Sequence, residues 1–367
     1  MKKVYVYSTQ LTKGAAMLKQ ILQYTRNHDC SDIHLIAHRK PVVREIGALL
    51  SLDLPTLEKN DVLDIIRTLL SEEQLDLYLS GNDVDCSFTD ETGRRYRINV
   101  YKQQGLPAIA LRLLNNHIPS IDELKLPPIL KEIALLPRGL VLVTGPTGSG
   151  KSTTLAAMIN HINVNKTRHI LTLEDPIEYI HESNHSMVNQ REIHKDVHDF
   201  NTGLRSALRE DPDVILVGEM RDYETISLAL TAAETGHLVL STLHTTGAAA
   251  TIDRIIDAFP PHQQSQIRIQ LANVLKAVIS QSLLPRADYA GRTAVHEIML
   301  MTDAIGNMIR ENKIVQINTA IQTGLRIGMQ TLDGNLAKLV TDQVISFEVA
   351  SEITSNVELL KRYLGRA

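Results

Sequence analysis

The chain has 367 residues, of which 43% are hydrophobic and 22% charged, and its formal net charge is −4 at pH 7. This composition is typical of a soluble globular protein and excludes a disordered or strongly basic chain, so we expect no nucleic-acid partner. The two cysteines, Cys30 and Cys86, are too few for a disulfide framework or a four-cysteine zinc site, and a reducing cytoplasm fits them best. No stretch approaches the ~18 apolar residues of a membrane span, so we expect no membrane insertion.

The length favours two domains, and residues 1–114 are predicted to form the first, a mixed α/β domain. Apolar residues at helical spacing predict helices around residues 17–22 and 62–70. Ser71 and Gln74 form a predicted capping box that begins another short helix, which ends before Gly81. Short strands are predicted around residues 33–46, where apolar pairs are broken by Lys40-Pro41 and Gly47.

A β-hairpin is predicted from two alternating apolar runs, residues 84–88 and 96–100, which flank a polar turn. Arg95 and Arg97 occupy the alternate positions around the second run, and Arg112 ends the next apolar strand. The sheet is therefore expected to present guanidinium groups outward.

Residues 115–127 contain prolines and polar residues that cannot sustain a regular element, so we predict the interdomain linker there. Residues 128–284 alternate apolar strands with helices, which is typical of a parallel sheet buried on both faces. The predicted strands are Gly139 to Thr144, Ile170 to Leu173, Val214 to Val217 and Leu238 to Leu243. After Pro285 the pattern predicts a mostly helical C-terminal part, residues 285–367.

A glycine-rich segment follows the first of these strands and matches the phosphate-binding pattern G-x-x-x-x-G-K-S. The nucleotide-binding residues predicted from it are Gly145, Pro146, Thr147, Gly148, Ser149, Gly150, Lys151, Ser152 and Thr153. The glycines let main-chain N–H groups surround phosphate oxygens at a helix start. The ammonium of Lys151 is expected to reach the β- and γ-phosphates and the hydroxyl of Ser152 to bind Mg²⁺. The alternative, an ordinary glycine-rich turn, is disfavoured by the strand before and the helical pattern after. ATP and Mg²⁺ are the predicted ligands.

Polar residues follow the other three predicted strands at their carboxyl ends, where parallel sheets bind ligands. Glu219 is predicted to hold the Mg²⁺ shell, and Glu178 to orient or deprotonate the attacking water. His244 is a candidate sensor of the γ-phosphate. The alternative for each is a solvated loop residue. Arg97 and Arg112 are candidates to complete the site from another domain, because a guanidinium stabilises charge that develops during phosphoryl transfer; the alternative is an exposed sheet face.

Four stretches besides the glycine-rich segment carry a resemblance to a known family: EDPIE at 174–178, ILVGEMRD at 215–222, TAAETGH at 231–237 and TLHTT at 242–246. The chain resembles the secretion and pilus ATPase superfamily, most closely its type IV pilus retraction branch. The resemblance implies an N-terminal PAS-like α/β domain followed by a RecA-like P-loop ATPase domain with a C-terminal helical part. It also implies a homo-hexameric ring in which Arg97 and Arg112 complete the active sites.

The same resemblance implies a cytoplasmic motor at the inner face of the cytoplasmic membrane. It would dock on an inner-membrane platform protein, act indirectly on pilus subunits and drive pilus disassembly. Assembly and type II secretion relatives carry a four-cysteine metal element before the segment matching Tyr289 to Arg292, which this chain lacks, and this favours retraction. The run Ala304-Ile305-Gly306 departs from the branch's usual Ala-Ile-Arg, so a retraction-assisting paralogue or an assembly or secretion ATPase stays an alternative. The alternatives of another class are a RecA-like nucleic-acid translocase and a protein that binds nucleotide without hydrolysing it.

Overall fold

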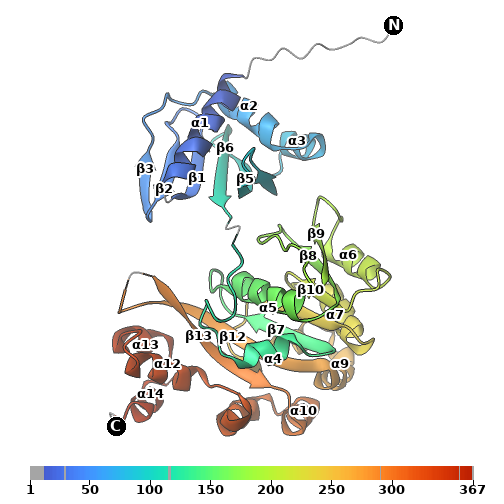
Figure 1. The fold of residues 1–367 in the computed structure, drawn as a ribbon. Helices are drawn as coiled ribbons and strands as arrows, with labels where there is room; N and C mark the ends of the chain where they lie inside the picture. Colours follow the sequence, from blue (N-terminus) through green and yellow to red (C-terminus); the bar gives the residue numbers. More distant parts are fainter. Residues whose placement is uncertain (1–11, 29, 115–116, 290, 355, 366–367) are drawn as a thin grey trace. The chain divides into compact units, whose positions relative to one another are not determined.

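The computed structural model describes residues 12–365 apart from residues 29, 115–116, 290 and 355. The chain divides into two compact units, Met1–Asn116 and His117–Ala367, each with its own sheet (Figure 1). Residues 115–116, at the start of the predicted linker, lie outside the described residues. The rest of that segment belongs to the second unit, because Ile121 and Leu126 are buried in its core. None of the described helices is long and apolar enough to cross a bilayer.

The first unit has a six-stranded antiparallel sheet in the order β3-β2-β1-β6-β5-β4. Its strands are β1 (Cys30–Ile36), β2 (Val42–Glu45), β3 (Ala48–Ser51), β4 (Val84–Thr89), β5 (Arg95–Gln103) and β6 (Leu106–Leu113). Its helices are α1 (Lys13–Asn27), α2 (Lys59–Leu69) and α3 (Glu72–Leu79). The predicted helices, short strands and hairpin are all present.

Helices α1 and α2 bury their apolar sides in one core with the sheet, as the helical spacing of those residues predicts. The predicted capping box of α3 is confirmed, because Ser71 Oγ accepts from the Gln74 N–H and Gln74 Oε1 accepts from the Ser71 N–H. Cys30 and Cys86 are buried in the same core. The prediction that Arg95 points outward is wrong, since it is buried. The chain after β6 reaches this end of β5, where the Leu114 N–H donates to the Arg95 carbonyl.

The second unit has a seven-stranded sheet in the order β13-β12-β7-β11-β10-β8-β9. All neighbours pair in parallel except β12 and β13, which are antiparallel. The strands are β7 (Gly139–Thr144), β8 (His169–Glu174), β9 (Met187–Glu192), β10 (Val214–Val217), β11 (Leu238–Leu243), β12 (Leu275–Pro285) and β13 (Arg292–Leu300). The four predicted strands are confirmed, whereas β9, β12 and β13 were missed. Strand β13 lies within residues 285–367, the part predicted to be mostly helical. It forms a strand there because it pairs with β12 along nine residues of register.

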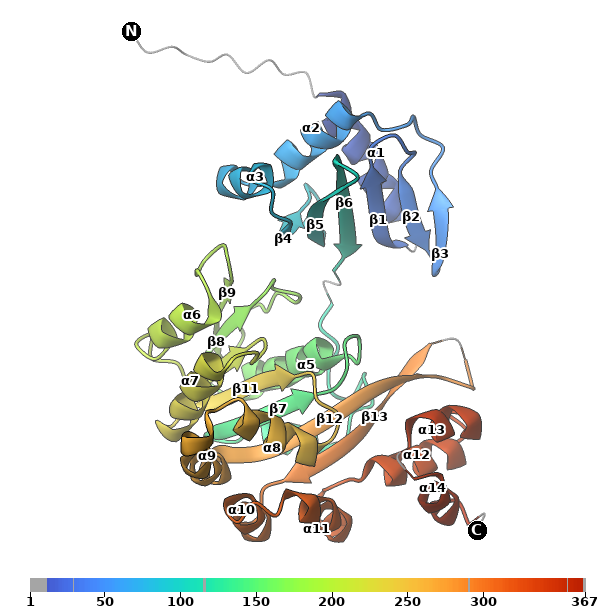
Figure 2. The ribbon, with the colours of Figure 1, turned by 180° about the vertical axis from the view of Figure 1, so that it is seen from behind.

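Helices cover both faces of this sheet (Figures 1 and 2). Successive residues of β7 point to opposite faces, so Val141 and Val143 join one core while Leu140 and Leu142 join the other. Helices α4 (Ile129–Ala134) and α5 (Lys151–Asn165) contribute to the first core. The second core is built with α6 (Phe200–Ala207), α7 (Tyr223–Glu234), α8 (Ala248–Asp257), α9 (Pro261–Val274), α10 (Asp303–Arg310) and α11 (Ile317–Thr323).

The chain ends in a small helical group that has a core of its own with residues of β12 and β13. It consists of α12 (Leu332–Thr341), α13 (Phe347–Ile353) and α14 (Val357–Tyr363). This group agrees with the mostly helical C-terminal part that the sequence predicts. It packs along the β12–β13 ribbon (Figure 2).

Candidate active site

The glycine-rich loop joins the end of β7 to the start of α5. Gly150 is the N-cap of α5 and has a left-handed φ of 85°. A residue with a side chain would be strained in this backbone conformation. Gly145 has a φ of 141°, and a Cβ there would lie 2.1 Å from the Gln281 carbonyl oxygen. The loop therefore needs glycine at both positions, for conformation at one and for space at the other. The middle of the loop is exposed at residues Pro146, Thr147 and Gly148.

Lys151 begins α5 and is almost fully buried. Its ammonium donates to the carbonyl oxygens of Gly145 at 2.9 Å and Pro146 at 3.0 Å. Burial lowers the pKa of Lys151, while the negative charges of Glu219 and Glu178 act in the opposite direction. The two predicted carboxylates are thus close enough to act on the lysine charge, although they come from different strand ends.

The loop and the start of α5 also offer hydrogen-bond donors that could bind an anion. The Oγ of Ser149 is buried and has no hydrogen-bond partner among the described residues. Ser152 is exposed at the first turn of α5. The first N–H groups of a helix have no intrahelical acceptor and favour negative charge. These features match the phosphate cradle predicted from the sequence.

Gln281 on β12 supports the glycine-rich loop through hydrogen bonds. The sequence analysis did not predict this role. Its side chain is buried, its Nε2 donates to the Ser149 carbonyl at 2.6 Å, and its Oε1 accepts from Thr154 Oγ1 at 2.7 Å. The same oxygen lies 3.2 Å from Nε2 of His296, which is also buried. Burial lowers the pKa of His296 to about 4, so this imidazole is neutral at physiological pH. No local signal marks this contact, because β12 is far from the loop in sequence.

Glu219 and His244 lie together after β10 and β11. Glu219 Oε2 is 3.5 Å from His244 Nε2, and Glu219 Oε1 is 2.7 Å from the Arg221 guanidinium. The Glu219 side chain is only 15% exposed, whereas that of His244 is half exposed. Adjacent parallel strands end at the same edge of a sheet, so β10 and β11 bring these two side chains together.

Glu178 lies in the segment that follows β8. The next residue, Tyr179, places its hydroxyl 3.0 Å from Thr153 Oγ1 on α5, so this segment contacts the helix that carries the P-loop lysine. Glu174, at the end of β8, accepts from Thr172 Oγ1 at 2.6 Å, and burial raises its pKa. The predicted nucleotide-binding loop and the residues Glu178, Glu219 and His244 thus belong to one edge of the second unit's sheet.

Arg97 and Arg112 are in the first unit and lie directly opposite each other on β5 and β6. The register extends this row through Asp32 on β1 to Arg44 on β2. Arg112 Nε donates to Asp32 at 3.0 Å, and Arg97 Nε donates to Asp85 at 3.1 Å. Like charges opposite each other repel, and the two aspartates offset this. The side chains of Arg97 and Arg112 are 39% and 69% exposed, so both lie on the sheet surface as predicted.

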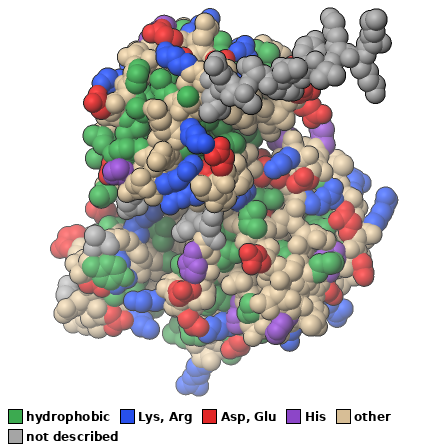
Figure 3. Space-filling model, turned by 45° about the horizontal axis from the view of Figure 1, so that its top comes forward, with side chains coloured by type: hydrophobic (Ala, Val, Ile, Leu, Met, Phe, Trp, Pro, Cys, Tyr) green, Lys and Arg blue, Asp and Glu red, His purple; other side chains and the backbone are tan. Residues whose placement is uncertain are grey.

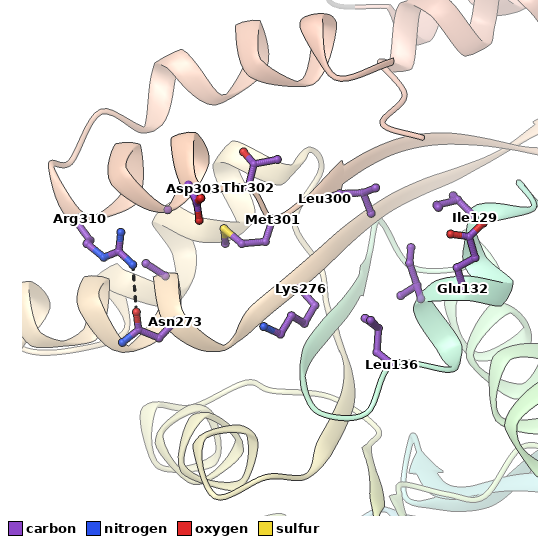
Figure 4. Close-up of a pocket in the computed structure, with 13 residues that line it drawn as sticks. Ile129, Glu132, Leu136, Asn273, Lys276, Leu300, Met301, Thr302, Asp303 and Arg310 are labelled. Atoms are coloured by element: carbon purple, nitrogen blue, oxygen red, sulfur yellow. Dashed lines mark hydrogen bonds between the residues drawn. The ribbon is translucent and has the colours of Figure 1, made fainter. Parts of the chain in front are cut away.

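A cavity of about 550 Å³ lies elsewhere in the second unit, between α4, α10, the end of α9, the start of β12 and the end of β13 (Figure 4). Its walls include Leu136, just before β7, and Lys276, near the start of β12. The P-loop begins at the other end of β7, so the cavity is at the opposite edge of the sheet. None of the predicted site residues lines it. The cavity is not the nucleotide site.

Residues 103–348 match the protein-family model described as Type II/IV secretion system protein, which covers more than half of the chain. The chain belongs to this family. A Neisseria gonorrhoeae relative named Twitching motility protein is 50% identical over 323 residues, 88% of this chain and 86% of its own length. The Pseudomonas aeruginosa protein named Type IV pilus retractation ATPase PilT is 48% identical over 335 residues, 91% of this chain and 97% of its own.

The fold matches a crystal structure described as the pilus retraction motor PilT with bound ADP. The TM-score is 0.87 at 44% identity, and the match covers 94% of this chain and 98% of the other. The predicted fold class, an N-terminal PAS-like α/β domain followed by a RecA-like ATPase domain, is confirmed. As a member of this secretion ATPase family with a P-loop at the expected strand end, the chain is a P-loop ATPase that uses adenine nucleotide.

Proposed function

We propose that this protein is a hexameric motor that hydrolyses ATP to drive retraction of a type IV pilus. The observation that carries the proposal is the P-loop with its acidic strand ends in a chain about half identical to retraction ATPases over most of its length. The motor acts at the inner face of the cytoplasmic membrane on a platform protein, and only indirectly on pilus subunits. Rigid-body movement between the two units is its mechanical output.

The residues of the second unit divide the chemistry among them. Lys151 and the loop N–H groups hold the β- and γ-phosphates and offset their charge. Glu178 orients the attacking water and accepts its proton, while His244 responds to the γ-phosphate. The hydroxyl of Ser152 and the carboxylate of Glu219 supply oxygen ligands for Mg²⁺, the latter directly or through water. A bound Mg²⁺ neutralises phosphate charge.

Arg97 and Arg112 complete the active site within the hexamer. Their proposed role rests on the family resemblance, and the paired guanidinium groups of the exposed row are suited to it. An arginine that contacts the transferring phosphate stabilises charge that is larger in the transition state than in the bound substrate. The two arginines therefore act on turnover rather than on nucleotide affinity.

Replacing Arg97 by alanine is expected to lower the maximal rate of ATP hydrolysis by about 10²-fold or more. The Michaelis constant for ATP should change much less, because the contact is made in the transition state. Phosphate release from the assembled protein measures both. Arg44→Ala is the matched control, since Arg44 belongs to the same row and is similarly exposed. Equal rates of ATP hydrolysis in Arg97→Ala and Arg44→Ala would show that Arg97 is an ordinary exposed residue without a role in hydrolysis.

A nucleic-acid translocase would present a continuous basic stripe. Among the described side chains on the face shown in Figure 3, Lys and Arg are interspersed with Asp and Glu. The net charge of −4 points the same way. Neither observation favours a polynucleotide track, and added DNA should leave the hydrolysis rate unchanged.

The direction of work is tested in the cell that carries the gene. Replacing the gene by a Lys151→Ala copy is expected to stop surface motility and to increase the number of pili per cell, because assembly continues without retraction. Electron microscopy and a motility assay measure these two quantities. Cells without pili would identify an assembly motor instead. Normal motility with normal piliation would assign the protein an accessory role.

A further inference from the structure

The segment that carries Glu178 runs from the end of β8 to the start of β9 at Met187 without regular secondary structure. A carboxylate on such a segment keeps one position only if other groups hold the backbone on both sides of it. On one side, the Ile177 N–H donates to Glu192 Oε2 at 3.2 Å. On the other side, Gln190 of β9 contacts the backbone of residues 179 and 181, and farther along Asn163 Nδ2 donates to the Glu182 carbonyl at 2.7 Å.

Gln190 uses both ends of its amide on this segment. Its Nε2 donates to the Tyr179 carbonyl at 2.8 Å and to Glu174 Oε1 at 3.1 Å, and its Oε1 accepts from the His181 N–H at 2.7 Å. The partners determine the orientation of the amide, because a flipped amide would face an N–H with an NH₂ and a carbonyl with an oxygen. The side chain thus replaces a strand partner for residues 179 and 181.

The register explains why this residue reaches the segment. Strands β8 and β9 are parallel, and Gln190 lies opposite Thr172, two residues before Glu174. Side chains at alternate positions share a face of the sheet, so Gln190 lies on the same face as Glu174. Tyr179, which Gln190 holds through its carbonyl, also places its hydroxyl on Thr153 at 3.0 Å. The hydrogen bonds connect β9, the Glu178 segment and the first turn of α5.

We propose that Gln190 is a positioning residue that fixes the carboxylate of Glu178 for the hydrolytic step. The proposal rests on the proposed role of Glu178 as the group that orients the attacking water. Only an amide of this length supplies one acceptor and two donors at once. A carboxylate at position 190 would face the Tyr179 carbonyl and Glu174 with oxygen atoms, and an aliphatic side chain would leave all three partners without this contact.

The test compares Gln190→Leu and Gln190→Glu with the parent protein in steady-state ATP hydrolysis. Both variants keep the size of the side chain, and the second keeps the acceptor for the His181 N–H, so a folding failure of one leaves the other available. The maximal rate is expected to fall by about 10- to 100-fold, the range that a displaced catalytic group produces. The Michaelis constant should stay within about twofold of the parent value. Asn189→Leu is the matched control, because Asn189 is the neighbouring residue of β9 and its exposed amide contacts His169 instead.

A double-mutant cycle with Glu178→Gln identifies the residue through which Gln190 acts. Glu178→Gln alone should lower the maximal rate by about 10²- to 10⁴-fold, and adding Gln190→Leu should lower it little further. If Gln190→Leu reduced the rate by the same factor in both backgrounds, Gln190 would act independently of Glu178 and the inference would be overturned. If Gln190→Leu hydrolysed ATP at the parental rate while Glu178→Gln was inactive, the inference about Gln190 would be overturned but the proposed role of Glu178 would stand. A normal rate in Glu178→Gln would instead remove the proposed role of Glu178 itself.

Discussion

Replacing Lys151 by alanine is expected to abolish hydrolysis and to remove most nucleotide binding. The ammonium is held at the loop by two main-chain carbonyls and is the cation that the β- and γ-phosphates would meet there. Loss of one such charge in a desolvated site lowers the rate by about 10²- to 10³-fold or more. Phosphate release measures this loss directly.

Thermal unfolding separates the loss of binding from a loss of folding. A ligand at 100 times its dissociation constant stabilises the native state by about 2.7 kcal/mol, which corresponds to roughly 5 °C for a domain of this size. The parent protein should show such a shift with ADP, and Lys151→Ala should show almost none. Lys276→Ala is the control, because this lysine is in the same unit but lines the cavity at the opposite edge of the sheet. Equal protection of Lys151→Ala and the parent would refute the phosphate cradle.

The second large effect is expected at Glu219, where alanine should stop turnover while ATP still binds. This carboxylate is mostly buried beside His244 and Arg221, and its negative charge acts on Lys151. Its proposed role with Mg²⁺ matters most for the charge that develops during phosphoryl transfer, so the maximal rate should fall by about 10²-fold or more. A fluorescent ATP analogue measures binding, and phosphate release measures turnover.

Glu234→Ala is the matched control for this substitution. Glu234 ends α7 in the same unit, is exposed and accepts one hydrogen bond from Gln270. The Glu234→Ala variant should hydrolyse ATP at the parental rate. Parental phosphate release by Glu219→Ala would remove Glu219 from the mechanism, whereas loss of ATP binding in that variant would assign it to ground-state binding.

Local sequence was sufficient to predict the P-loop and most of the first unit. A strand, a glycine turn and a helix start are adjacent in the chain, so their spacing alone determines which N–H groups surround a phosphate. Periodicity predicted α1, α2 and the β4–β5 hairpin for the same reason. Glu178, Glu219 and His244 could be named because each follows an apolar strand of a parallel sheet, and such strand ends meet at one edge.

The tertiary structure alone decided what supports these residues. Gln281 contacts Ser149 and Thr154 across 132 and 127 positions of sequence. Gln190 lies on β9, whose polar residues give no apolar strand pattern. Strand β13 was missed because its pairing with β12, rather than its own periodicity, makes it a strand. Periodicity reports which side of an element is buried, but the partner of a polar side chain is set only when distant strands come into register.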